Sequence, residues 1–284
     1  MIGREYMQIS SLLDRGKSNL EEDASFIGRK FVGVLDGVSE THKYRDGPKN
    51  IGGKSGGQCV VDIIKTTFES ANGSMSLEQL ALEANERIKE FAMANSLPLD
   101  EGDKLPGAAA ILVHLGEKHV DIIQASDALG VYQMCDGSVR VIANPKLAYE
   151  IEIVKAQREL LAKNGGDIAL MWDEHFFMQV GMRIRFVNSP SAPAGFNFSL
   201  FNGQHQLARC WRQIQIKRKL LARLIIFTDS FVGFDISRSE DTLGENLISR
   251  YQSGGKNKGG LEKILKWTRS LGEHGEATAI AIEF

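Results

Sequence analysis

The chain has 284 residues, 43% of them hydrophobic, so it is long and apolar enough to bury a sizeable core. Its formal net charge of -2 gives no electrostatic reason to expect a nucleic acid or an anionic membrane as partner. The three cysteines lie far apart without CxxC spacing, and the sequence contains neither a signal peptide nor a run of about 20 apolar residues, so we expect a cytoplasmic protein without structural zinc.

The first predicted elements form a short hairpin. Two β-prone runs lie between Ser25 and Leu35 and are joined by a turn at Gly28. The second run is apolar enough to be buried on both faces, and it ends directly before Asp36 and Gly37. An aspartate is therefore expected at the end of a buried strand.

Two helices are predicted next, with no strand between them. Apolar residues recur at helical spacing after Gly57, and a second helix follows a capping box formed by Ser76 and Gln79. Such a pair predicts a helical layer on one sheet. Four strand-like runs follow, at 109–115, 119–125, 130–134 and 138–142. Because short turns join them, we expect an antiparallel meander.

The second half of the chain is less regular. A helix is expected over 147–163, whereas 167–206 mixes short runs with turn residues and supports no assignment. A buried strand over 224–227 delivers Asp229 to its end. The remaining predicted elements are a helical stretch, a glycine-rich loop at 254–260, a last helix and a strand over 278–284. With no internal repeat and no linker, residues 1–284 are expected to form one α+β domain.

Several acidic residues fall at or beside the predicted strand ends. They are Glu22, Asp23, Asp36, Asp127 and Asp229. Carboxylates brought together are costly to ionise unless a cation neutralises them, and oxygen ligands without histidine or thiolate favour Mg²⁺ or Mn²⁺. Two such ions can activate a water for attack on a phosphoryl group. Taken singly, each aspartate is more typical of a turn or a solvated strand end.

The order of the motifs adds to this pattern. They are Asn19-Leu-Glu-Glu-Asp23-Ala24, Val34-Leu-Asp36-Gly37, Gly107-Ala-Ala-Ala110, Ala125-Ser-Asp127-Ala128, Phe227-Thr-Asp229-Ser230 and Glu276-Ala-Thr-Ala-Ile280. In this order they resemble the successive motifs of the type-2C (PPM-type), metal-dependent serine/threonine protein phosphatases, as in a divergent bacterial-like member. The resemblance spans nearly the whole chain. It implies a four-layer α-β-β-α sandwich, with two antiparallel sheets packed face to face and helices on both outer faces.

The resemblance also implies roles for the acidic residues. Asp36 would bridge two metal ions, with the Gly37 carbonyl on one of them and Asp229 on the other, which makes Asp36 and Asp229 the catalytic pair. Glu22 and Asp23 would bind the ions directly or through water. The implied cofactors are two Mn²⁺ or Mg²⁺ ions.

Other positions match the family less closely. Asp127 corresponds to the aspartate of a third, weaker metal site, but Gly233 stands where a further acidic residue is expected, with Asp235 nearby. Near the family's phosphate-binding arginine lie Lys17 and Ser18. Lys17 is the candidate because an ammonium can hold a phosphate as a point charge, although an ordinary exposed lysine explains it equally well.

The closing motif departs most. Gly275 stands where the family has a metal-binding aspartate. Glu276, one residue on, is the candidate replacement ligand because its longer arm could reach the metal, although strand alternation would direct it to the opposite face unless the backbone bends at Gly275. Two functions follow: hydrolysis of phosphoserine or phosphothreonine in a phosphorylated protein substrate, or a weak or inactive relative that serves as a regulatory or binding module.

Two further segments carry weaker signals. The stretch GPKNIGGKS at 47–55 is a poor match to a phosphate loop, because its first glycine comes one residue too early for GxxxxGKS and no buried strand directly precedes it. In a phosphatase it would be an enlarged loop beside the metal site, where its backbone N–H groups or Lys54 could meet substrate. The basic run at 212–223 is compatible with a partner-binding patch and with a solvated face that leads into the next strand.

Overall fold

The computed structural model describes residues 7–17, 21–39, 51–102, 104–167, 181, 185–196, 199–232, 240–272 and 275–284. Within these residues the strands form two five-stranded antiparallel sheets. The first sheet has the order β1 (Gln8–Asp14), β10 (Ala277–Glu283), β9 (Leu221–Phe227), β6 (Leu129–Met134) and β7 (Val139–Ile142). The second has the order β2 (Asp23–Ile27), β3 (Phe31–Val38), β4 (Gly107–Leu115), β5 (His119–Ala125) and β8 (Arg212–Lys217).

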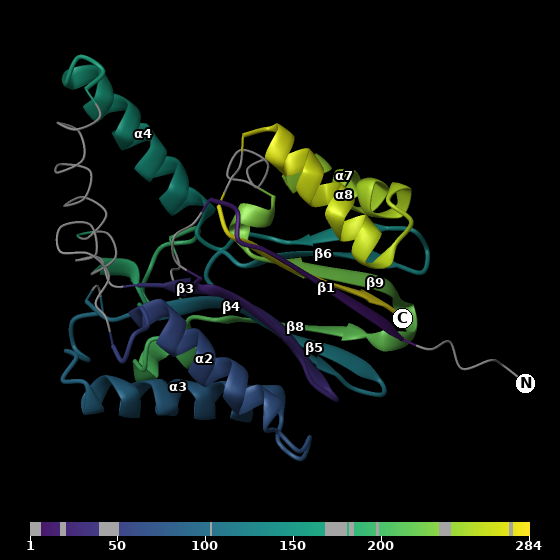
Figure 1. Cartoon of the computed structure of the whole chain (residues 1–284), viewed down its shortest axis with the longest axis horizontal. Helices are drawn as coiled ribbons and strands as arrows, with labels where there is room; N and C mark the ends of the chain where they lie inside the picture. Colours follow the sequence, from purple (N-terminus) through teal and green to yellow (C-terminus); the bar gives the residue numbers. More distant parts are fainter. Residues whose placement is uncertain are drawn as a thin grey trace, which may run out of the picture.

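Helices cover the outer face of each sheet (Figure 1). The helices are α2 (Gly56–Glu69), α3 (Leu77–Ala94), α4 (Leu147–Lys163), α7 (Glu240–Ser253) and α8 (Asn257–Ser270), with short 3-10 turns η1 (His205–Arg209), η2 (Arg218–Leu220) and η3 (Asp229–Phe231). Helices α2 and α3 pack on the second sheet, and α7 and α8 pack on the first. The predicted four-layer α-β-β-α sandwich is confirmed.

Strand β3 shows why its sheet is covered on both faces. Phe31 and Leu35 point into the core under α2 and α3, whereas Val32 and Val34 point into the core between the sheets. The apolar run predicted to be buried on both faces is therefore covered on both. The same alternation along β10 sends Ile280 between the sheets and its neighbours toward α7 and α8.

Helices α2 and α3 each begin at a serine capping box. Ser76 accepts a hydrogen bond from the Gln79 backbone N–H, and the Gln79 side chain accepts one from the Ser76 N–H, so the predicted capping box is present. Ser55 and Gln58 make the same arrangement at the start of α2. Helix α4 spans the predicted 147–163 and rises from one end of the sandwich (Figure 1).

Two expectations differ from the structure. The four central strands are not one meander, because β4 and β5 pair in the second sheet whereas β6 and β7 pair in the first. The chain crosses between the sheets at 126–128, where Ser126 has a φ of 59°. The loop expected at 254–260 is mostly the start of α8. A glycine is needed at Gly260 because a Cβ there would lie 2.4 Å from the Tyr251 ring.

Two strands were not anticipated. Strand β1 pairs with β10 at the edge of the first sheet, and β8 pairs with β5 at the edge of the second. The basic run at 212–223 thus contains an edge strand whose exposed Arg212 and Lys217 discourage further strand pairing. No helix in the described part of the chain is long and apolar enough to cross a membrane.

Candidate metal centre

Four aspartates from both sheets lie at one end of the sandwich. Asp23, the first residue of β2, is directly opposite Asp36 in the β2–β3 ladder. Asp229 begins η3 immediately after β9, and Asp127 lies in the crossing between β5 and β6. Asp36 was expected just past a strand end, but β3 continues to Val38 because it pairs with β4 as far as Gly107.

The charges of these aspartates act on one another. Burial, and after it the charges of Asp23, Asp229 and Asp127, raise the pKa of Asp36 well above its usual value. Burial also raises the pKa of Asp23, with further contributions from Glu276 and Asp229. The pKa of Asp229 rises from 3.8 to about 7, first through burial and then through the charge of Asp127. The backbone arrangement therefore concentrates negative charge where little water can screen it.

Hydroxyl groups orient part of this cluster. The Thr228 Oγ1 donates to Asp23 Oδ2 at 2.8 Å and accepts a hydrogen bond from the Thr278 N–H at 3.0 Å. Asp23 is thereby tied to β9 and β10 of the other sheet. The cluster rests on both sheets, so its geometry depends on how they pack.

Asp127 has a different environment from the other three aspartates. Its Oδ2 lies 2.5 Å from the Lys146 Nζ, and both side chains are almost fully buried. Burial alone would raise the pKa of Asp127, but the charge and hydrogen bond of Lys146 outweigh it and hold this pKa below its usual value. Lys146 also lowers the pKa of Asp36 and Asp229. It is thus a cation within the acidic cluster.

Glu22 turns toward the start of α2. The hydroxyls of Ser39 and Ser55 both donate to its Oε1, the latter at 2.5 Å. A Cβ on Gly57 would lie 2.8 Å from the same oxygen. Glu22 thus joins β2 to the helix N-terminus, where a carboxylate is favourable.

Glu276 turns toward the backbone of β2. Its Oε2 accepts a hydrogen bond from the Glu22 N–H at 2.9 Å, and its Oε1 is buried without a hydrogen-bond partner among the described residues. Burial raises the pKa of Glu276. Ile280 and Ile282 of β10 point between the sheets, so the same alternation, continued back to the residue before β10, places Glu276 on this inner face rather than on the opposite one. The Gly275 carbonyl meanwhile accepts a hydrogen bond from Arg269.

The other predicted positions lie as follows. Gly37 has no room for a side chain, because a Cβ would lie 2.6 Å from the Glu22 carbonyl oxygen, which accepts the Gly37 N–H. Lys17 is exposed in the turn after β1, and no hydrogen bond or ion pair of the described residues joins it to the aspartates. Lys54 is paired with Asp62 at 2.5 Å. Ser18, Gly233, Asp235 and parts of 47–55 and 167–206 lie outside the described residues.

The donor chemistry fits a hard divalent cation at Asp23, Asp36 and Asp229. These are oxygen donors in a water-poor region, and a cation there would relieve their mutual repulsion. Asp127, Glu22 and Glu276 already hold other partners. Among the residues that the structure describes, no three His, Cys, Asp or Glu side chains stand arranged as a ready ligand set.

Solved structures match the chain over nearly its whole length, although no family model and no curated protein matches it. The Mycobacterium tuberculosis serine/threonine phosphatase PstP/Ppp is 12% identical, covers 98% of both chains and has a TM-score of 0.60. Stp1 from Staphylococcus aureus is 15% identical, covers 100% of this chain and 99% of its own, and also has a TM-score of 0.60. The PstP catalytic domain in complex with two manganese ions covers 98% and 97%, at 12% identity and a TM-score of 0.56.

The chain has the fold of the bacterial serine/threonine phosphatases. The resemblance stated from the motifs is thereby confirmed at the level of the fold. Within this phosphatase fold, the aspartates at the end of the sandwich come from the segments that carried the resemblance, at 23, 36, 127 and 229.

Lys146 is the residue of this phosphatase-fold site that sequence reasoning missed. One signal was present, since a lysine at a helix N-terminus opposes the helix dipole and needs a reason to be there. The reason is Asp127, nineteen positions earlier in the chain, which no local pattern connects to it.

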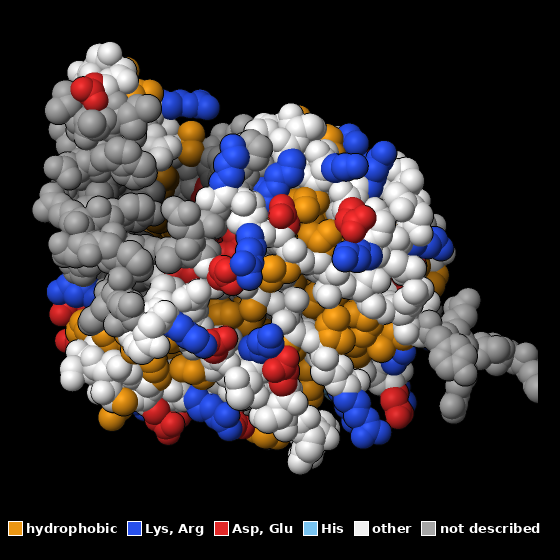
Figure 2. Space-filling model, viewed as in Figure 1, with side chains coloured by type: hydrophobic (Ala, Val, Ile, Leu, Met, Phe, Trp, Pro, Cys, Tyr) orange, Lys and Arg blue, Asp and Glu red, His pale blue; other side chains and the backbone are white. Residues whose placement is uncertain are grey.

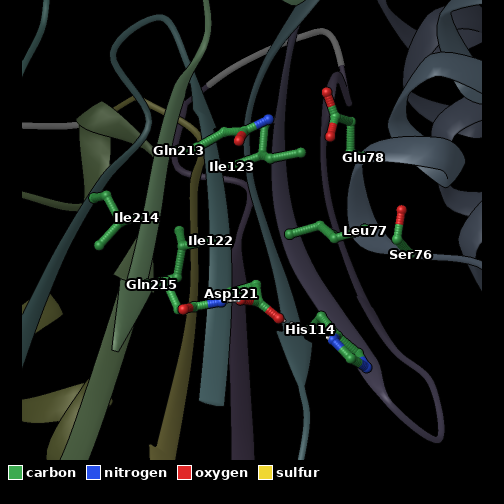
Figure 3. A pocket seen from close by; sticks show the side chains of 10 residues that line it. All are labelled: Ser76, Leu77, Glu78, His114, Asp121, Ile122, Ile123, Gln213, Ile214 and Gln215. Carbon is green, nitrogen blue, oxygen red and sulfur yellow. Dashed lines mark hydrogen bonds and ion pairs between the residues drawn. The ribbon is translucent and has the colours of Figure 1, made fainter. Parts of the chain in front are cut away.

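A separate pocket of the phosphatase fold lies on the outer face of the second sheet (Figure 3). It has a volume of about 420 Å³ and lies between the start of α3 and strands β5 and β8. The His114 and Asp121 side chains in it are 3.2 Å apart, and His114 also stacks on Phe31. His114 is five positions along β4 from Ala109, the partner of Asp36, which is about 17 Å along the strand, so the His114–Asp121 pair lies apart from the aspartates.

Proposed function

We propose that the chain hydrolyses phosphoserine or phosphothreonine in proteins, with Mn²⁺ or Mg²⁺ held by the aspartates at the end of the sandwich. The observation that carries the proposal is the burial of Asp23, Asp36 and Asp229 within electrostatic reach of one another. The manganese complex of PstP, which shares the fold, supports two ions as the number. We infer that residues 1–284 act as one such domain.

Each residue has a distinct part in this proposal. Asp36 and Asp229 would hold the ions, with Asp23 oriented by Thr228 and the Gly37 carbonyl as a further ligand. Such ions supply activation of a water molecule and neutralisation of phosphate charge. Lys17 is the proposed phosphate contact. The dispersed charges on the face in Figure 2 form no large field of one sign, so specificity for the protein substrate would come from local contacts.

The proposal is tested by turnover of p-nitrophenyl phosphate and of a phosphoserine peptide in Mn²⁺. Asp36→Asn should lower kcat/KM by about a hundredfold or more, because it removes a central metal ligand while keeping the side chain's size. Asp100→Asn, at an exposed turn far along the chain, is the matched control and should keep the wild-type rate. Equal, negligible rates for the wild type and Asp36→Asn at saturating Mn²⁺ would rule out the enzyme.

A second function is favoured by specific observations. The Lys146 ammonium is paired with the Asp127 carboxylate, and the Glu276 carboxylate accepts a hydrogen bond from the backbone just before β2. Gly275 stands where the aspartate is expected. These features suit a phosphatase-fold regulatory or binding module with weak or no turnover. Gly275→Asp discriminates the two, since restored turnover in an inactive wild type would identify the missing carboxylate as the cause.

A further inference from the structure

A buried cation lies beside Asp127 at the edge of the aspartate cluster. The Lys146 Nζ is 2.5 Å from Asp127 Oδ2 and 3.7 Å from Glu150 Oε1, and all three side chains are only 11–12% exposed. Lys146 directly precedes α4, the helix that rises from this end of the sandwich (Figure 1). The ion pair therefore joins the crossing between the sheets to the base of α4.

The surrounding residues hold both partners in place. The Lys146 N–H donates to Asn144 Oδ1 at 3.0 Å, and Asn144 Nδ2 donates to Glu150 Oε2 at 2.9 Å. On the other side, the Ser126 N–H donates to Ser199 Oγ at 3.0 Å in the turn that presents Asp127. Lys146 is thus fixed by its own backbone hydrogen bond and Asp127 by that of its neighbour Ser126, and the contact is a built feature of the fold.

This contact occupies the place that an ion would need. Oxygen ligands lie about 2.0 to 2.6 Å from Mg²⁺ or Ca²⁺, so an ammonium 2.5 Å from Asp127 fills the same coordination position. Displacing it would leave the buried ammonium without its nearest carboxylate, which is unfavourable because a charge in a water-poor site is costly without a close partner. A divalent ion therefore competes poorly at Asp127 while Lys146 is present.

We propose that Lys146 is a built-in cation that takes the place of a metal ion at Asp127. Divalent ions then bind on the side of Asp23, Asp36 and Asp229, and Asp127 with Glu150 serves to hold the ammonium. The inference rests on the proposed function only for the binding of divalent ions at Asp23, Asp36 and Asp229, whereas the exclusion of metal from Asp127 by Lys146 does not depend on it. The positive charge at this edge of the site is then supplied by a lysine of the chain and not by a metal ion.

The test counts bound Mn²⁺ by calorimetry and by electron paramagnetic resonance, independently of turnover. Lys146→Met should bind about one more Mn²⁺ per chain than the wild type, because Asp127 and Glu150 lose their only described cation. Lys146→Arg keeps the charge and should bind the wild-type number. The double variant Lys146→Met with Asp127→Asn should lose the added ion, which places that ion at Asp127.

Asp127→Asn alone is the second measurement, and it keeps the proposal testable if Lys146→Met does not fold. It should leave the Mn²⁺ number unchanged and its Kd within about threefold of the wild type's, since Asp127 is not a ligand. Loss of an ion in Asp127→Asn, or an unchanged number in folded Lys146→Met, would overturn the proposal.

The outcome is separable from the proposed function. If the wild type and Asp36→Asn both bind no Mn²⁺, the catalytic proposal fails. A Lys146→Met protein that then gains an ion still upholds the assignment of Lys146.

Discussion

Replacing Asp229 with asparagine measures the repulsion within the aspartate cluster. Burial and the charge of Asp127 raise the pKa of Asp229 from 3.8 to about 7. This difference corresponds to roughly 4 kcal/mol of free energy favouring the protonated carboxyl in the folded state. Because neighbouring carboxylates share protons, we expect a measured effect of about 1 to 3 kcal/mol. The folded state holds this proton more tightly than the unfolded state, so the stabilising contribution is complete below about pH 4 and is lost as the pH rises to about 7.

The assay is urea unfolding in a chelator, followed by circular dichroism from about pH 4 to pH 8. The free energy of unfolding of Asp229→Asn should exceed that of the wild type by about 1 to 3 kcal/mol near pH 8, and the difference should shrink toward pH 4. Added Mn²⁺ should reverse the order, because it binds the wild type better. Asp100→Asn is the control. Parallel pH profiles for the wild type and Asp229→Asn would refute the clustering of charge.

Two further tests concern how Glu22 and Gly37 support the site, one with a pair of serine substitutions and one with a glycine substitution. Ser55→Ala and Ser76→Ala each remove a helix N-cap, so Ser76→Ala should lower the free energy of unfolding by about 1 kcal/mol. Ser55→Ala should lower it further, because Ser55 also donates to the buried Glu22 carboxylate, and equal losses in urea unfolding would contradict that role. Gly37→Ala should lower the free energy of unfolding by about 1 to 3 kcal/mol, because its Cβ would lie 2.6 Å from the Glu22 carbonyl oxygen. A variant that melts at the wild-type temperature would show that the strands adjust freely.

Elements whose signals are local were predictable from the sequence. The apolar run before Asp36 predicted β3, and the capping box at Ser76 predicted the start of α3, because burial on both faces and cap hydrogen bonds involve residues close in the chain. The order of the acidic motifs carried the resemblance to the type-2C phosphatases, which implied the sandwich and brought the aspartates at 23, 36, 127 and 229 into one hypothesis. Their meeting in one region agrees with that hypothesis, while their roles as ligands remain a proposal.

Other features depended on contacts between distant segments. Strands β1 and β8 lie at sheet edges with mixed exposed and buried residues, so their sequences carry no clear alternation, and only pairing with β10 and β5 makes them strands. The turn between β5 and β6 does not encode that the chain changes sheets there.

The crossing between β5 and β6 also determines which charged side chains meet at the site. It carries Asp127 to the base of α4, where Lys146 lies 2.5 Å away. By itself the sequence determined the phosphatase-like fold and the set of acidic candidates. Only the tertiary structure decided which of them face one another and which one is already paired with a lysine, because side-chain proximity across the sandwich is set by how the two sheets pack.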